Sequence, residues 1–135
     1  MIKLPIETDY AFRIMQTLAR ENVRCDTTTL AEKCGITKQS ALKVLRRLLC
    51  GGLVKAFQGV NGGYELALPA GQITLISIME AVGEDMKFSR CLDPEYDCSR
   101  MHCHKEACCF HRLFCEINED IIAKLSSMRL SDTVK

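Results

Sequence analysis

Apolar side chains recur every three to four residues near the start of the chain, which is the spacing of one face of an α-helix. The first run covers residues 6–20, and its apolar positions are Ala11, Ile14, Met15, Leu18 and Ala19. A second, shorter helix is expected to open with Thr29, because Glu32 follows three residues later as in a capping box. Gly35 fits the left-handed residue that ends such a helix.

A third helix is predicted to begin after Thr37, which can cap it, and to close at Gly51-Gly52. Its inner face would consist of Ala41, Val44, Leu45, Leu48 and Leu49. Two helices joined by a short turn that contains glycine are typical of the helix-turn-helix.

Two short apolar runs follow, residues 53–57 and 64–68, and they predict a pair of β-strands. The segment between them, Gly59-Val60-Asn61-Gly62-Gly63, is suited to a hairpin tip because glycine and asparagine tolerate positive φ angles. A β-hairpin placed after the third helix makes a wing. The predicted fold class is therefore mainly α with a small β-hairpin, a winged helix-turn-helix.

Thr74 can cap a fourth helix, with Ile76, Met79 and Val82 on one side and Gly83 at its end. Residues 84–108 show no periodicity. From about residue 109 a long apolar stripe appears at helical spacing: Phe110, Leu113, Phe114, Ile117, Ile121, Leu125 and Met128. Little of the domain remains for this stripe to cover, so we expect it to pack on a second subunit.

The chain is thus expected to consist of a winged helix-turn-helix DNA-binding domain (1–84), a cysteine-rich cluster-binding loop (85–108) and a dimerisation helix with a C-terminal tail (109–135). At 135 residues, 47% of them hydrophobic, the composition is that of a small globular protein. No apolar run reaches the length of a membrane span, and Glu7 and Asp9 stand where a signal peptide needs apolar residues. We expect a cytoplasmic protein without a membrane partner.

Net charge is only +1, but the basic residues are unevenly distributed. Residues 33–64 contain six lysines and arginines and no acidic residue, which favours contact with phosphates. A recognition helix needs polar side chains near its N-terminus to reach base edges in double-stranded DNA. The candidate DNA-binding residues are Lys38, Gln39, Ser40, Lys43 and Arg46 in the third helix, and Lys55, Gln58 and Asn61 in the wing.

Six of the nine cysteines and all three histidines lie between Cys91 and Cys115. In a reducing cytoplasm structural disulfides are disfavoured, so these residues indicate metal ligands or reactive thiols. The spacings of Cys91, Cys98, Cys103 and Cys108 lack the tight C-x-x-C pair typical of structural zinc, whereas iron–sulfur clusters tolerate wider spacing.

The remaining cysteines and histidines divide by position. Cys25, Cys34 and Cys50 are expected to be small core or surface residues, and Cys115 has no obvious partner. His102 and His104 are expected to be solvated loop side chains. His111 lies three residues after Cys108 at the start of the last helix, so both side chains share a face, and His111 is a candidate ligand.

Several segments together resemble the Rrf-two-type family of bacterial winged-helix transcriptional regulators. They are Asp9-Tyr10-Ala11, Leu30-Ala31-Glu32 with Gly35-Ile36-Thr37, Gly52-Leu53-Val54, Gly59 with Gly62-Gly63-Tyr64, and Ile73-Thr74-Leu75, followed by the cysteine loop and the long helix. The resemblance implies a homodimer in which the long C-terminal helices pair. It also implies an iron–sulfur cluster, either 2Fe–2S or 4Fe–4S, held by three loop cysteines and a fourth ligand, and of the two we expect 2Fe–2S.

Within this resemblance, Cys91 matches the first family cysteine and Cys108 the third. The second is either Cys98 or Cys103. For the fourth ligand, His111 matches the histidine of the iron–sulfur-biogenesis regulators, and Asp9 matches an acidic residue that ligates the partner's cluster in nitric-oxide sensors.

The resulting hypothesis is a homodimeric transcriptional repressor whose operator affinity is set by an iron–sulfur cluster that senses redox state, nitric oxide or iron–sulfur status. Two alternatives remain open: a cluster-free regulator controlled by thiol redox chemistry or a partner protein, and a zinc-stabilised DNA-binding or scaffold protein. An enzyme is not expected, because the sequence contains no nucleophile–base pair, phosphate loop or paired carboxylates.

Overall fold

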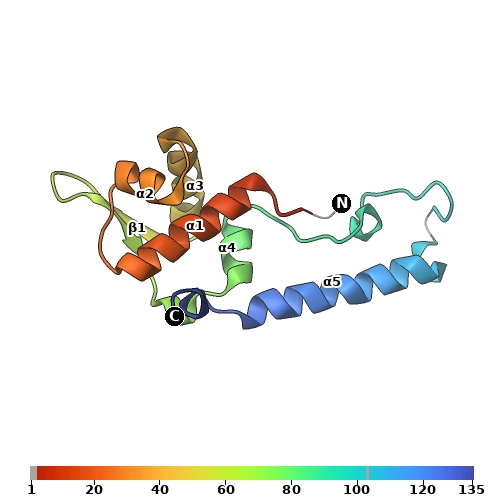
Figure 1. The fold of residues 1–135 in the computed structure, drawn as a ribbon. Helices are drawn as coiled ribbons and strands as arrows, with labels where there is room; N and C mark the ends of the chain where they lie inside the picture. The colour runs from red at the N-terminus through yellow and green to blue at the C-terminus, as the bar shows by residue number, and fades with distance from the viewer. Residues whose placement is uncertain (1–2, 103) are drawn as a thin grey trace.

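A computed structural model describes residues 3–102 and 104–135 of the chain. Helices and a two-stranded hairpin follow in the order α1 (Ile6–Glu21), α2 (Thr27–Cys34), α3 (Lys38–Cys50), β1 (Val54–Phe57), β2 (Gly63–Leu66), α4 (Leu75–Ala81) and α5 (Cys109–Ser127). Short 3₁₀ turns occur at Ala70–Gln72, Arg90–Leu92, Lys105–Ala107 and Leu130–Thr133. The predicted mainly α fold with a winged helix-turn-helix is confirmed (Figure 1).

The capping residues explain where the helices begin. The Thr37 side chain accepts a hydrogen bond from the Ser40 amide at 3.1 Å, and Thr74 caps α4 in the same way, as predicted. The cap of α2 differs from the prediction. Asp26 accepts the hydrogen bond from the Thr29 amide at 2.7 Å, so Thr29 lies inside the helix and the capping box expected there was wrong.

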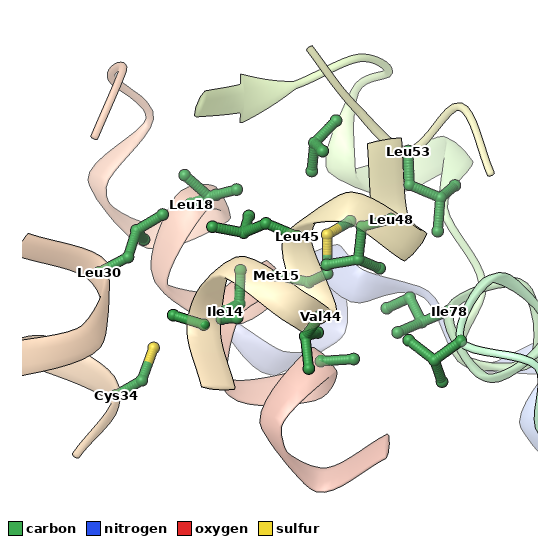
Figure 2. Close-up of a cluster of buried hydrophobic side chains, with 14 of the residues drawn as sticks. Ile14, Met15, Leu18, Leu30, Cys34, Val44, Leu45, Leu48, Leu53 and Ile78 are labelled. Carbon is green, nitrogen blue, oxygen red and sulfur yellow. The ribbon is translucent and has the colours of Figure 1, made fainter. Parts of the chain in front are cut away.

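The hydrophobic core lies where α1, α2, α3 and α4 meet. Figure 2 shows Ile14, Met15 and Leu18 of α1 facing the buried side chains of α3. Of the predicted inner face of α3, Ala41, Val44, Leu45 and Leu48 are buried. Leu49 is 40% exposed, because it lies at the edge of that face, and its expected burial was wrong. Burial of these side chains holds α3 rigidly against the body.

The wing is an antiparallel pair of strands in which Val54 lies opposite Leu66 and Phe57 opposite Gly63. A third segment joins it, because Cys25 and Tyr64 exchange two backbone hydrogen bonds at 2.9 and 2.7 Å. The wing is therefore attached to the chain between α1 and α2 as well as to α3.

Helix α5 lies along one side of the molecule and has no buried residue of its own (Figure 1). Its C-terminal end is attached to the body, since the Leu130 amide donates to the Ile73 carbonyl at 2.8 Å and the Leu75 amide donates to the Met128 carbonyl at 3.0 Å. Near its middle, Asn118 accepts from the Phe88 amide at 2.7 Å and donates to the Met86 carbonyl at 3.0 Å. No helix within the described residues is long and apolar enough to cross a membrane.

Candidate metal centre and nucleic-acid interface

A cavity of about 390 Å³ lies between the irregular loop and the first two turns of α5. It is lined by Ser89, Arg90, Cys91, Tyr96, Cys98, Arg100, Met101, Lys105, Cys108, Phe110, His111 and Phe114. Cys91 and His111 stand at opposite ends of the loop in the sequence, but the fold brings them to the same cavity. Four of the six candidate ligands therefore line one cavity: Cys91, Cys98, Cys108 and His111.

The imidazole of His111 lies between two thiols. Its Nδ1 is 3.4 Å from Cys91 Sγ, and its Nε2 is 3.7 Å from Cys115 Sγ, one helical turn further along α5. The expectation that Cys115 has no partner was wrong. Contacts at both ring nitrogens fix the orientation of the imidazole, as the outer partners of metal-binding histidines do.

Two thiols of the cavity, Cys98 and Cys108, have pKa values lowered from the ordinary cysteine value. The backbone amide of His111, in the first turn of α5, is the main cause that lowers the pKa of Cys108, and the Arg100 guanidinium, which donates to Cys108 Sγ at 3.2 Å, adds to it. The backbone amides of Met101 and then Arg100 lower the pKa of Cys98. A thiolate is the form that binds metals and attacks oxidants, so both side chains suit either role.

The donor set fits an iron–sulfur cluster. Thiolate sulfur and imidazole nitrogen are the protein ligands of such clusters, which contain more than one iron and so reach ligands that stand apart. Among residues 3–102 and 104–135, no three cysteine, histidine or acidic side chains are grouped closely enough to hold a single metal ion. Cys103, the remaining candidate cysteine, lies outside the described residues.

Asp9, the other candidate ligand, is not part of this cavity. Its carboxylate pairs with Arg13 one turn further along α1, at 2.7 Å. His102 Nδ1 is 3.4 Å from a carboxylate oxygen of Asp97 and does not line the cavity. Within one chain, then, Asp9 is separate from the cysteines, and ligation by Asp9 would have to occur across a dimer.

The candidate DNA-binding residues of α3 are exposed except for Ser40, which is half-buried. Gln39, Ser40, Lys43 and Arg46 line one shallow hollow, and Lys38 begins the helix beside it. Helix α3 presents these polar side chains on the face opposite to its buried residues, which is the arrangement a recognition helix requires.

Sequence reasoning missed a network that attaches α3 to α1. Glu7 accepts from Lys43 at 2.7 Å and from Arg47 at 2.9 Å. The hydrogen bond from Lys43 is the main cause that lowers the pKa of Glu7, and the charge of Arg47 acts in the same direction. Arg47 also donates to the Val82 carbonyl at 2.7 Å, where α4 ends and the loop begins.

The wing residues Lys55, Gln58 and Asn61 are exposed. A further residue that sequence reasoning missed, Arg24, contacts the same hairpin. Its guanidinium lies over the Phe57 ring and donates to the Asn61 carbonyl at 3.1 Å.

The sequence pattern of the family described as "Rrf2: Iron-dependent Transcriptional regulator" matches residues 4–135. The HTH-type transcriptional regulator IscR of Xenorhabdus nematophila is 31% identical over 106 residues, which are 78% of this chain and 62% of that protein. "Protein aau3" of Rhizobium meliloti is 28% identical over 72% of this chain and 64% of its own length. The chain thus spans less than two thirds of these two relatives.

Solved structures share the fold. CymR of B. subtilis, described as the global cysteine regulator, has a TM-score of 0.78 at 21% identity and matches 99% of this chain and 97% of its own. IscR of T. potens has a TM-score of 0.75 at 21% identity, with 98% and 86% covered. Since the family pattern covers nearly the whole sequence, this chain belongs to the Rrf2 family of transcriptional regulators.

Proposed function

We propose that this protein is a homodimeric, DNA-binding transcriptional repressor whose operator affinity is controlled by an iron–sulfur cluster held between the loop and α5. The observation that carries the proposal is the convergence of Cys91, Cys98, Cys108 and His111 on one cavity at the start of α5. The lowered pKa values of Cys98 and Cys108 support it, because thiolates are the required ligands.

Cys91 and Cys108 are the proposed ligands common to every version of the site, and His111 is the fourth ligand that the cavity itself offers. Cys98 completes the set from the same cavity, with Cys103 as the alternative second cysteine. Asp9 of a second subunit is the alternative fourth ligand. A 2Fe–2S cluster is preferred over 4Fe–4S, on the resemblance described above.

When bound, such a cluster supplies a redox- and nitric-oxide-sensitive group that links the loop to α5. The surrounding residues orient the proposed ligands and offset their charge. Contacts to Cys91 and Cys115 hold His111 in place, and Arg100 adds positive charge beside Cys108, which offsets the charge of the thiolates. If Cys91 and Cys108 held such a group together, the loop would be tied to the first turn of α5.

Exposed apolar side chains of α5 support the proposed dimerisation. Phe110, Leu113 and Ile117 are 60%, 51% and 39% exposed in the single chain. Neighbouring large apolar side chains at such exposure indicate a protein interface. Two recognition helices must reach half-sites about one helical turn, roughly 34 Å, apart, so a small displacement of α5 changes operator binding.

The deciding experiment is anaerobic purification followed by measurement of iron, acid-labile sulfide, zinc and visible absorbance. Iron and sulfide in equal amounts with a visible spectrum support the proposal. Zinc without sulfide would instead establish a zinc-stabilised protein. Colourless protein without metal, after attempted reconstitution, would leave thiol redox control or a partner protein as the regulatory device.

Single alanine variants then identify the ligands. Cys91→Ala and Cys108→Ala should each lose the cluster, whereas one of Cys98→Ala and Cys103→Ala should be tolerated. Asp9→Ala and His111→Ala distinguish the fourth ligand, and Cys50→Ala, an exposed cysteine at the end of α3, is the matched control. A full, stable cluster in the Cys91→Ala/Cys108→Ala double variant would contradict the assigned site.

A further inference from the structure

Arg24, in the connection between α1 and α2, contacts the wing at three places. Its guanidinium carbon lies 3.3 Å from the centroid of the Phe57 ring, at the end of β1. Its Nη1 donates to the backbone carbonyl of Asn61, at the hairpin tip, at 3.1 Å. Its Nε is 3.5 Å from a carboxylate oxygen of Glu65 in β2. One side chain thus joins both strands and the tip.

The backbone around Arg24 is fixed to the same hairpin. The next residue, Cys25, exchanges hydrogen bonds with Tyr64. Gly63 has a φ of +139°, and a Cβ there would lie 2.5 Å from the Cys25 carbonyl oxygen, so only glycine permits this approach. The Arg24 backbone therefore cannot move away from the wing without breaking the Cys25–Tyr64 pair.

The guanidinium group is suited to this role in a way that an ammonium group is not. A planar cation can stack on an aromatic ring and still direct N–H groups to two acceptors. Arg24 and Arg20 are both exposed, but only Arg24 is held by contacts. The side chain of Arg20, at the end of α1, has no partner among the described residues.

We propose that Arg24 is a positioning residue for DNA recognition, which holds the wing tip in the pose that presents Lys55, Gln58 and Asn61 to the operator. The proposal rests on the proposed contact between wing and DNA. In this proposal Arg24 acts through the hairpin and not as a phosphate ligand, since its Nη1 and Nε are directed to Asn61 and Glu65.

The experiment is a double-mutant cycle of operator affinity, with an operator selected from random DNA by the native protein. One arm is Arg24→Ala. The other is a stripped wing, Lys55→Ala/Gln58→Ala/Asn61→Ala, which leaves the Asn61 carbonyl that Arg24 contacts. Arg24→Lys keeps the charge, and Arg20→Ala is the matched loss of a nearby arginine. Thermal unfolding of each variant shows whether the body remains folded.

Arg24→Ala should weaken operator binding by about ten-fold, the size of a lost base contact. Arg24→Lys should have the same low operator affinity as Arg24→Ala, and Arg20→Ala should have nearly native affinity. In the stripped-wing variant, adding Arg24→Ala should cause no further loss of affinity.

Restored affinity in Arg24→Lys, or additive losses in the cycle, would show that Arg24 is a phosphate ligand and would overturn the proposal. So would a stripped wing with native affinity. If the native protein selected no operator at all, the proposed DNA-binding function would be contradicted, whereas the outcomes above contradict only the role of Arg24.

Discussion

Glu7 is the residue whose contacts bear most directly on DNA binding. Its carboxylate pairs with Lys43, a candidate DNA-binding residue, at 2.7 Å and with Arg47 at 2.9 Å, so it offsets part of their positive charge. In a DNA complex, phosphates would compete with Glu7 for the same cations. Glu7 thus stabilises the contact between α1 and α3 and at the same time reduces the positive potential of the recognition helix.

Glu7→Gln should therefore strengthen DNA binding. With Lys43 released, we expect the slope of log affinity against log salt to become steeper by about one unit, as for one more phosphate contact. Operator titrations over a range of salt concentrations measure this slope. The control is Glu21→Gln, at the other end of α1, which breaks the 2.9 Å pair with Lys33 of α2 and should leave the slope unchanged. An unchanged slope in Glu7→Gln would show that Lys43 does not reach the DNA.

The same variant predicts a pH effect on stability. Because the pKa of Glu7 is lowered in the folded protein, its contribution is present above the ordinary glutamate pKa and is lost as the pH falls through the lowered value. At neutral pH, Glu7→Gln should lower the free energy of unfolding by less than about 1 kcal/mol, since the pair is partly exposed. Urea denaturation should show this difference disappearing in strong acid. An equal difference at both pH values would contradict the assignment.

At the scale of elements, hydrophobic periodicity and capping residues were sufficient to predict the helices and the wing. Thr37 and Thr74 cap α3 and α4 as expected, because each cap depends only on neighbouring residues. Arg24 and Glu7 were missed because their partners lie 33 or more residues away in sequence. The Cys115–His111 contact was within reach of sequence reasoning, since residues four apart share a helix face.

Helix α3 carries a prediction of its own. Gln39 is exposed at the start of the helix and has no partner among the described residues, so its amide is available to a base edge. Gln39→Ala should weaken operator binding by about 1–3 kcal/mol while binding to random DNA stays the same. Equal losses on both kinds of DNA, or none, would mean that another part of the molecule reads the sequence.

Helix α5 predicts the oligomeric state. Ile117→Glu/Ile121→Glu places two carboxylates on the apolar stripe of α5, at exposed Ile117 and half-buried Ile121. Burial of such charges in a dimer without partners costs several kcal/mol, of the order of 3 or more. Sedimentation should find a monomer. Ala123→Glu, on the opposite face of the same helix, is the matched control and should remain a dimer. A folded dimer of native size in the double variant would place the interface elsewhere.

At the scale of the whole molecule, α5 joins the candidate metal centre to the DNA-binding body. Its first turn borders the cavity, and its other end is hydrogen-bonded to residues 73–75 at the start of α4. The far end of α4 is in turn held by Arg47 of the recognition helix, through the Val82 carbonyl. A continuous set of contacts therefore connects the cysteine loop with α3 inside one chain. Demonstrating coupling requires a measurement at both ends.

That measurement is operator affinity of one anaerobic preparation in three states: as purified, after removal of iron with a chelator, and after reconstitution with iron and sulfide. The account predicts a change of about ten-fold or more on iron removal, which is the lower range of allosteric coupling, and full recovery on reconstitution. In all three states, Cys108→Ala should bind the operator with the affinity of the native protein from which iron has been removed. Equal operator affinity with and without iron, in protein shown to hold the cluster, would contradict the central claim.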